Sequence, residues 1–163
     1  MSVVHSSRFA LKPVVTAVAL AVAAVAHGAP TPNQLPGAGR ITDVSPGATV
    51  NGLGVDNNIV NLANPALITL GGAANAYAVI NWGGNAAAIA AEVTNPFGFN
   101  IGSAGKLTFT STGGTANAAV LNIDASGNPS QIFGQLESST VGGGVAPSMF
   151  IANGNGIVVG AGG

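Results

Sequence analysis

The sequence has no cysteine and few charged or aromatic residues. Of its 163 residues, 6% are charged and 5% are aromatic. The absence of cysteine excludes a disulfide framework and any metal site built on thiolates. The shortage of cations excludes a basic surface for nucleic acid. The only lysines and arginines are Arg8, Lys12, Arg40 and Lys106.

Histidines and acids are also too sparse to indicate catalysis. Both histidines, His5 and His27, lie within the first 28 residues, so the rest of the chain has no base for a Ser-His-Asp triad. The acids are scattered, without the paired spacing of a glycosidase. They are Asp43, Asp56, Glu92, Asp124 and Glu137. The stretch "GSAGKL" (102–107) lacks the glycine spacing and the final Ser or Thr of a phosphate loop. We therefore expect no catalytic residue, no metal site and no cofactor.

Residues 1–28 have the pattern of a signal peptide. Residues 1–12 carry two cations and no acid, and residues 13–26, "PVVTAVALAVAAVA", carry no charge. This apolar run is shorter than the roughly 20 residues of a membrane-spanning helix, and small residues follow it. We expect removal of this leader during export, by cleavage after Ala26 or after Gly28. The alternative is a buried helix rich in alanine and valine.

Short stretches of alternating apolar and polar residues dominate the sequence after residue 40. A period of two, with many Val, Ile, Thr and Phe residues and with Gly, Asn and Pro between the stretches, is typical of β-strands. The leading loop, residues 29–40, contains three prolines that exclude helix. One stretch, "AAAIAAEV" (86–93), favours a short helix. Strands are expected within 48–52, 57–72, 77–82, 106–112, 119–123, 130–136, 148–152 and 156–160.

The even spacing of the later strands fits either a β-sandwich or a β-solenoid. Asn and Gly at many corners, and Thr and Ser in place of charges on outward faces, favour the solenoid. The corner "ANGNGI" (152–157) has the sharpest turn signal. There, Asn153 or Asn155 is expected to bridge backbone groups, and Gly156 is expected to have a positive φ.

Five motifs occur in order along the chain, and together they resemble one known family. They are "INW" (80–82), "FNIG" (99–102), "LN" (121–122), "NPSQIFGQL" (128–136) and "NGNGI" (153–157). The series resembles the N-terminal secretion domain of two-partner secretion exoproteins, the filamentous haemagglutinin family. The earlier "QLPGAGRI" (34–41) resembles the opening segment of that domain. The resemblance covers most of residues 35–160 and is strongest from Phe99 onward.

The sequence departs from the family pattern at three places. Gly154 stands where the family usually has proline. Residues 83–97 separate Trp82 from Gly98, where the family keeps a short link. The sequence also stops at Gly163, where the family's domain would continue. This last departure suggests a truncated domain, a fragment or the end of a degraded reading frame.

The resemblance implies an all-β fold, a right-handed parallel β-helix with one strand path, over residues 29–163 and incomplete at its C-terminus. It implies a non-catalytic secretion signal for an exoprotein of the adhesin or toxin-carrier type. The implied partners are the general export machinery and then an outer-membrane transporter, whose periplasmic receptor domains recognise the chain. Membrane contact would be limited to translocation, and the product would be secreted or displayed at the cell surface. No nucleic acid is implied.

The corner motifs contain the residues expected to serve transporter recognition or the shape of the corners. They are Asn128, Pro129, Ser130, Asn153, Gly154, Asn155, Gly156 and Ile157. Asn side chains often bond nearby backbone groups, so a structural role and a transporter contact both stay open. Trp82, the only tryptophan, is expected to anchor the edge of the core, with sugar stacking as the alternative. For the whole chain, the alternative is a free-standing small secreted β-rich surface or binding protein, or the remnant of a degraded exoprotein gene.

Overall fold

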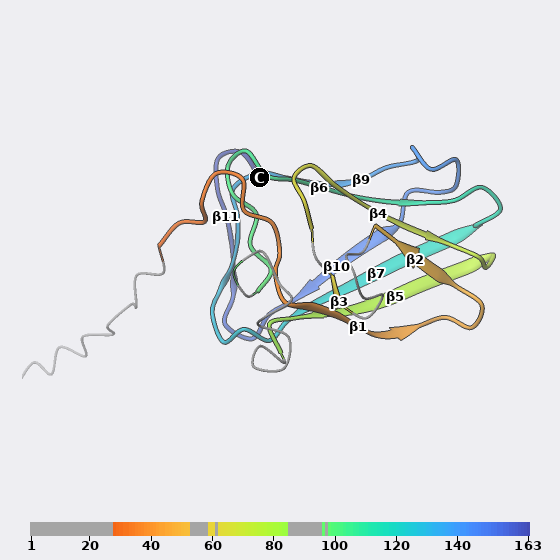
Figure 1. Ribbon diagram of the computed structural model, residues 1–163, viewed down its shortest axis with the longest axis horizontal. Coiled ribbons are helices and arrows are strands. Elements are labelled where there is room, and N and C mark those ends of the chain that lie inside the picture. Colours follow the sequence, from red (N-terminus) through yellow and green to blue (C-terminus); the bar gives the residue numbers. More distant parts are fainter. Residues whose placement is uncertain (1–27, 53–58, 61, 85–95, 97) are drawn as a thin grey trace, which may run out of the picture.

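The computed structural model describes residues 28–52, 59–60, 62–84, 96 and 98–163, and this part of the chain is all-β (Figure 1). It forms strands and turns, with no helix among these residues. The strands are β1 (Gly39–Val44), β2 (Thr49–Asn51), β3 (Ile59–Val60), β4 (Ala66–Gly71), β5 (Asn75–Trp82), β6 (Lys106–Ser111), β7 (Asn117–Asp124), β8 (Ser130–Ile132), β9 (Gln135–Ser138), β10 (Ser148–Ala152) and β11 (Ile157–Val159).

The strands form three sheets, which lie along the three sides of a roughly triangular outline in Figure 1. The first sheet has the order β10-β7-β5-β1-β3, and the second has the order β2-β4-β6-β9. The third pairs β11 with β8, and an isolated bridge adds Ile101 beside Ile132. Each expected strand segment after residue 40 contains a strand where the structure describes it, and β5 and β7 show the alternating burial that a period of two predicts.

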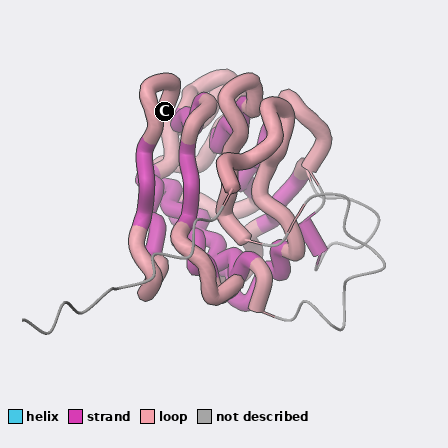
Figure 2. Tube along the Cα trace, turned by 90° about the vertical axis from the view of Figure 1, so that its left-hand side faces the viewer, coloured by secondary structure: helices cyan, strands magenta, loops and turns pink. Residues whose placement is uncertain are grey.

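The chain visits the three sheets in the same order on successive passes. We call β6, β7 and β8 the middle pass, and β9, β10 and β11 the last pass. Each strand of the last pass pairs in parallel with its counterpart in the middle pass. Lys106 pairs with Gln135, and Ala119 pairs with Ser148, both 29 residues later in the numbering. Figure 2 shows segments of these passes side by side.

The sheets are mixed, because the first strands pair antiparallel. β1 runs antiparallel to both β5 and β3, and β2 runs antiparallel to β4. From β4 onward, the neighbours β4-β6-β9 and β5-β7-β10 are all parallel. Parallel pairing throughout, which the family resemblance implied, therefore holds for the later strands and not for β1, β2 and β3.

The core lies inside the triangle and is filled mainly by one face of the strands; β6 is buried on both faces, and β11 is exposed along its length. On β5, Ala76, Ala78, Ile80 and Trp82 point inward and are buried, while Tyr77 between them is exposed. The largest fully buried side chains of the described residues are Trp82, Phe99, Phe109, Leu35, Ile68, Leu70, Ile80, Ile101 and Leu107. Burying a side chain of this size stabilises the fold by roughly 1.5–3 kcal/mol.

Two expectations lie outside the described residues. The helix expected over 86–93 falls in a segment that the structure does not describe, and so does the leader up to residue 27. Both stay predictions. At the start of the described chain, Gly28 and Ala29 are exposed. The Gly28 carbonyl accepts a hydrogen bond from Gln131 Nε2 at 3.2 Å.

Candidate functional site

The two corner motifs singled out in the sequence lie on top of one another. "NPS" leads into β8, and "NGNGI" leads into β11, the strand that pairs with β8 in parallel. Ser130 and Ile157 are partners in this register, and the Ser130 N–H donates to the Gly156 carbonyl at 3.1 Å. The 128–130 corner belongs to the middle pass and the 153–157 corner to the last pass. Two motifs more than twenty residues apart therefore form one surface.

Residues Asn153–Gly156 form a β-turn. The Gly156 N–H donates to the Asn153 carbonyl at 3.2 Å, and Gly156 has a φ of 98°. The expected positive φ at Gly156 is confirmed. Gly154 occupies the second position of the turn, the one where proline is favoured. This geometry explains how the corner can carry either glycine or the proline usual in the resembled family.

The Asn153 side chain holds the two corners together. Its Nδ2 donates to the Asn128 carbonyl at 2.8 Å and to Ser130 Oγ at 2.9 Å, while its Oδ1 accepts from the Asn155 N–H at 2.8 Å. The expected bridging of backbone groups at the bend is thus confirmed for Asn153. The Asn155 side chain is exposed. Asn153 is therefore a structural clamp, and Asn155 is available at the surface.

Below the corners, a buried carboxylate continues the network inward. Asp124 is 4% exposed, and its Oδ2 accepts from Ser130 Oγ at 2.7 Å and from the Phe99 N–H at 2.9 Å. Its Oδ1 accepts from the Ser126 N–H at 3.0 Å. Three hydrogen bonds offset the desolvation that burial of a carboxylate costs.

This role of Asp124 was not predicted from the sequence, in which Asp124 is one of the scattered acids. A local signal was present in "DASGN": Asp followed by Ser two residues later is typical of a turn in which the carboxylate caps a backbone N–H. That pattern predicts the bond to Ser126. It does not predict the bonds to Phe99 and Ser130, because these depend on how the chain packs.

Trp82 lies deep in the same network and not at the edge of the core, where the sequence analysis placed it. Its side chain is fully buried, and its ring meets the Phe99 ring edge-on, with centroids 5.6 Å apart. Its Nε1–H donates to Asn122 Oδ1 at 3.1 Å, and Asn122 Nδ2 donates to the Phe150 carbonyl at 3.3 Å. The indole presents no surface on which a sugar could stack.

These contacts join all five motifs into one continuous network. Trp82 of "INW" touches Phe99 of "FNIG" and bonds Asn122 of "LN". Phe99 bonds Asp124, which bonds Ser130 of "NPS". Ser130 in turn bonds Asn153 of "NGNGI". Segments spread over residues 80–157 thus depend on one another for their positions.

The opening segment also belongs to this assembly. The Gly102 N–H donates to the Gln34 carbonyl at 2.9 Å. Any side chain at Gly102 would collide with the backbone oxygens of Thr31 and Pro32. The glycine of "FNIG" is therefore required by the close approach of residues 31–34, which lead into the segment 34–41 that resembles the family's opening.

Some charged side chains outside the corner network also form contacts. Within the described ranges, no three His, Cys, Asp or Glu residues gather where they could hold a metal ion. Lys106 Nζ forms an ion pair with Glu137 at 2.9 Å, with both side chains about two-fifths exposed. On the opposite side, the Tyr77 hydroxyl donates to Asp43 Oδ2 at 3.1 Å. This bond and the charge of Asp43 raise the pKa of Tyr77 above its usual value.

Comparison with known proteins leaves the chain without an assigned relative. No family model, no curated protein and no solved structure matches it. Across the residues that the structure describes, no helix is long and apolar enough to cross a membrane.

Proposed function

We propose that the chain is a parallel β-helix acting as the secretion-signal domain of a two-partner secretion exoprotein. The parallel register from β4 onward and the fixed order in which the chain visits three sheets support the β-helix. Parallel strands of one sheet are almost always joined by right-handed crossovers, which supports a right-handed coil. The antiparallel β1, β2 and β3 then serve as the cap that a solenoid needs at its end.

One observation carries the functional part of the proposal. The five motifs on which the resemblance rests are linked in space by the chain of contacts from Trp82 to Asn153. Chance matches scattered along a sequence have no reason to meet in one network. The network ends at an exposed corner, Gly154–Ile157, where a partner can reach it.

The proposed export route uses the leader first and residues 29–163 afterwards. The leader directs the protein to the general export machinery, and the periplasmic receptor domains of an outer-membrane transporter then recognise residues 29–163. β9, β10 and β11 each stand at the end of their sheet, so each has a free edge in the described structure. A receptor domain can add a strand to such an edge, using backbone hydrogen bonds that require no charged residues. The exoprotein is secreted or displayed at the cell surface.

The test is transporter-dependent release. The full chain is fused ahead of a reporter protein and expressed in a bacterium with an outer membrane, with and without a two-partner transporter. We expect the reporter in the medium only when the transporter is present. Release without the transporter, or retention with every transporter of this class that is tried, would contradict the proposal. Release without it would favour a free-standing secreted protein.

Matched variants locate the recognition surface. Asn128→Ala combined with Asn153→Ala disrupts the stacked corners, and we expect the released fraction to fall about tenfold, equivalent to about 1.4 kcal/mol. Asn51→Ala, at an exposed asparagine of β2, is the control and leaves release unchanged. Asn155→Ala removes only an exposed side chain of the last corner. If it also lowers release without lowering stability, the transporter contacts the corner directly.

A further inference from the structure

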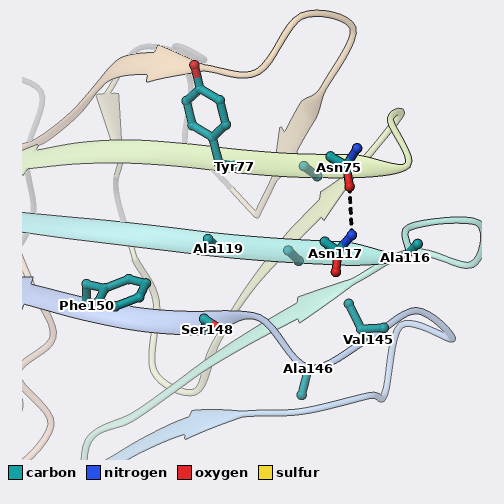
Figure 3. A pocket seen from close by; sticks show the side chains of 11 residues that line it. Asn75, Tyr77, Ala116, Asn117, Ala119, Val145, Ala146, Ser148 and Phe150 are labelled. Carbon is teal, nitrogen blue, oxygen red and sulfur yellow. Dashed lines mark hydrogen bonds between the residues drawn. The ribbon is translucent and has the colours of Figure 1, made fainter.

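The outer face of the first sheet carries a hollow that the corner network does not use. It has a volume of about 460 Å³ and lies over β5, β7 and β10 (Figure 3). Its lining includes Tyr77 from β5, Ala119 from β7 and Phe150 from β10. Val145 and Ala146, just before β10, close one end. The hollow thus combines three parallel strands with a loop.

The shape of the hollow follows from which side chains are small. In the strand register, Tyr77, Ala119 and Ser148 form one row across the sheet. Neighbouring strands lie about 4.8 Å apart, so about 10 Å separates β5 from β10. Ala119 and Ser148 leave this row low beside the exposed Tyr77. The exposed Phe150 belongs to the next row on the same face, level with Leu121. Tyr77 is 40% exposed and Phe150 is 56% exposed.

Two asparagines present hydrogen-bonding groups at the same end as Val145 and Ala146, away from Phe150 (Figure 3). Asn117 Nδ2 donates to Asn75 Oδ1 at 2.7 Å, as the dashed line in Figure 3 shows. This bond fixes both amides and leaves Asn75 Nδ2 as a donor and Asn117 Oδ1 as an acceptor, neither of which bonds any described residue. The Ser148 hydroxyl, exposed at the margin, can donate or accept. A ligand here meets a donor and an acceptor side by side.

Charged side chains are nearly absent around the hollow. No charged side chain lines it. The Asp43 carboxylate accepts a hydrogen bond from the Tyr77 hydroxyl, and this contact also holds the tyrosine ring in place. Such a site has no group to neutralise a phosphate, a sulfate or a carboxylate, so its ligand is uncharged.

We propose that this hollow binds two linked, uncharged sugar rings of a glycan, one against Phe150 and one against the two asparagines. Phe150 pairs with Leu121, four residues along β7 from Asn117, so the two contacts lie about 13 Å apart. A sugar ring has an apolar face of C–H groups, which suits an exposed aromatic ring such as Phe150, and it carries neighbouring hydroxyls that both donate and accept. Those hydroxyls match the Asn75 donor and the Asn117 acceptor. A purely apolar ligand would leave both amide groups without partners, which lowers affinity. The site is separate from the secretion corner and does not depend on the proposed transport function.

The test is a titration of the purified protein with neutral disaccharides: maltose, cellobiose, lactose and chitobiose. Side-chain amide signals of Asn75 and Asn117 are followed by NMR. We expect at least one sugar to shift both signals, with a dissociation constant of about 1–10 mM, equivalent to roughly 3–4 kcal/mol. Sialyllactose, which carries a carboxylate, should bind no more tightly than lactose. If none of the four sugars shifts these signals, the proposal is wrong.

Variants distinguish specific binding at this site from nonspecific binding to exposed apolar side chains. Phe150→Ala and Asn117→Ala should each weaken binding about tenfold, a loss of about 1.4 kcal/mol. Leu67→Ala removes an apolar side chain of β4 that is exposed to a similar degree, 46%, and should leave binding unchanged. Binding that survives both site variants, or equal shifts produced by a short peptide of alanine and valine, would overturn the assignment to a sugar.

Discussion

The middle and last passes run side by side in the same register, yet their exposure differs sharply. Ser130 of β8 is fully buried, while its partner Ile157 of β11 is 43% exposed. Ile132 is 5% exposed, while its partner Val159 is 61% exposed. The polar Ser130 is thus buried, while the apolar Ile157 and Val159 are exposed. Hydrophobicity alone does not decide burial in this protein.

The number of neighbouring strands in the sheet explains the difference in exposure. β7 lies between β5 and β10, whereas β10 has β7 on one side only. The same holds for β6, which lies between β4 and β9. A middle strand is covered from both sides, so its inward-facing polar side chains are buried and must find partners there, as Asn122 and Asp124 do. The last pass has no such cover in this structure.

The largest effect should come from removing a core ring in the middle pass. Phe109→Ala deletes a fully buried side chain of β6, and we expect the free energy of unfolding to fall by about 3–5 kcal/mol. Phe150→Ala in the last pass removes an exposed ring and should change stability by about 0.5 kcal/mol or less. Urea denaturation of both variants measures the contrast. Equal losses of stability in the two variants would contradict the difference in burial between the middle and last passes.

The polar network should show the same contrast at a smaller scale. Asp124→Ala leaves the Phe99 N–H and the Ser130 hydroxyl unsatisfied in the core, at a cost of about 2–4 kcal/mol. Asn153→Ala, in the last pass, exposes its former partners to water and should cost only about 1 kcal/mol. Denaturant midpoints of the two variants decide the order, and the reverse order would contradict the network described here.

Backbone conformation, in contrast, should cost the same in both passes. Gly127 in the middle corner has a φ of 84°, and Gly156 in the last corner has a φ of 98°. A Cβ at either position would meet nothing within 4 Å, so only the strained backbone is penalised. We expect Gly127→Val and Gly156→Val each to destabilise the fold by about 1–3 kcal/mol. A difference above about 1 kcal/mol between the two variants would show that packing also matters there.

The last corner should also accept a stabilising change. Gly154 lies at the second position of the Asn153–Gly156 turn, its φ is not positive, and a Cβ there would meet nothing within 4 Å. Proline restricts the unfolded chain and suits this position, so Gly154→Pro should raise the free energy of unfolding by about 0.4–1 kcal/mol. A melting temperature lower than that of the parent protein would show that the turn has another geometry.

The smallest effect concerns the outer face of β5, and it can be read without unfolding the protein. Tyr77 is the only tyrosine, so the absorbance change on phenolate formation reports it alone. The hydrogen bond to Asp43, and then the charge of Asp43, raise its pKa, so the titration midpoint should lie above pH 10.0. Asp43→Asn should move it back toward that value. A midpoint at or below that of the variant would refute the contact.

The sign of the pH dependence follows from the same shift. Because the pKa of Tyr77 is raised in the folded protein, the tyrosine of the unfolded chain ionises first. The stability that this contact adds is present below pH 10.0 and is lost as the pH rises from there toward the folded pKa. Asp43→Asn should reduce this loss of stability at high pH.

Local patterns in the sequence determined the strands and the sharpest turn. The alternation in "YAVINW" and "KLTFTST" placed β5 and β6, and "SMFIA" coincides with β10, Ser148–Ala152. The Asn-Gly pairs of "NGNGI" placed the turn that ends at Gly156 with its positive φ. These features depend on residues within one strand or one bend, so a single stretch of sequence contains all the information that they require.

Only the tertiary structure decided which groups meet. The sequence did not show that β1, β2 and β3 pair antiparallel, that Trp82 lies inside the core, or that Asp124 joins Phe99 to Ser130. Each of these depends on strand register between segments far apart in the chain, and that register is set by how the whole core packs. The local sequence therefore does not show that Asp124 is buried or that Val159 is exposed. Their burial depends on which pass of the chain lies beside them.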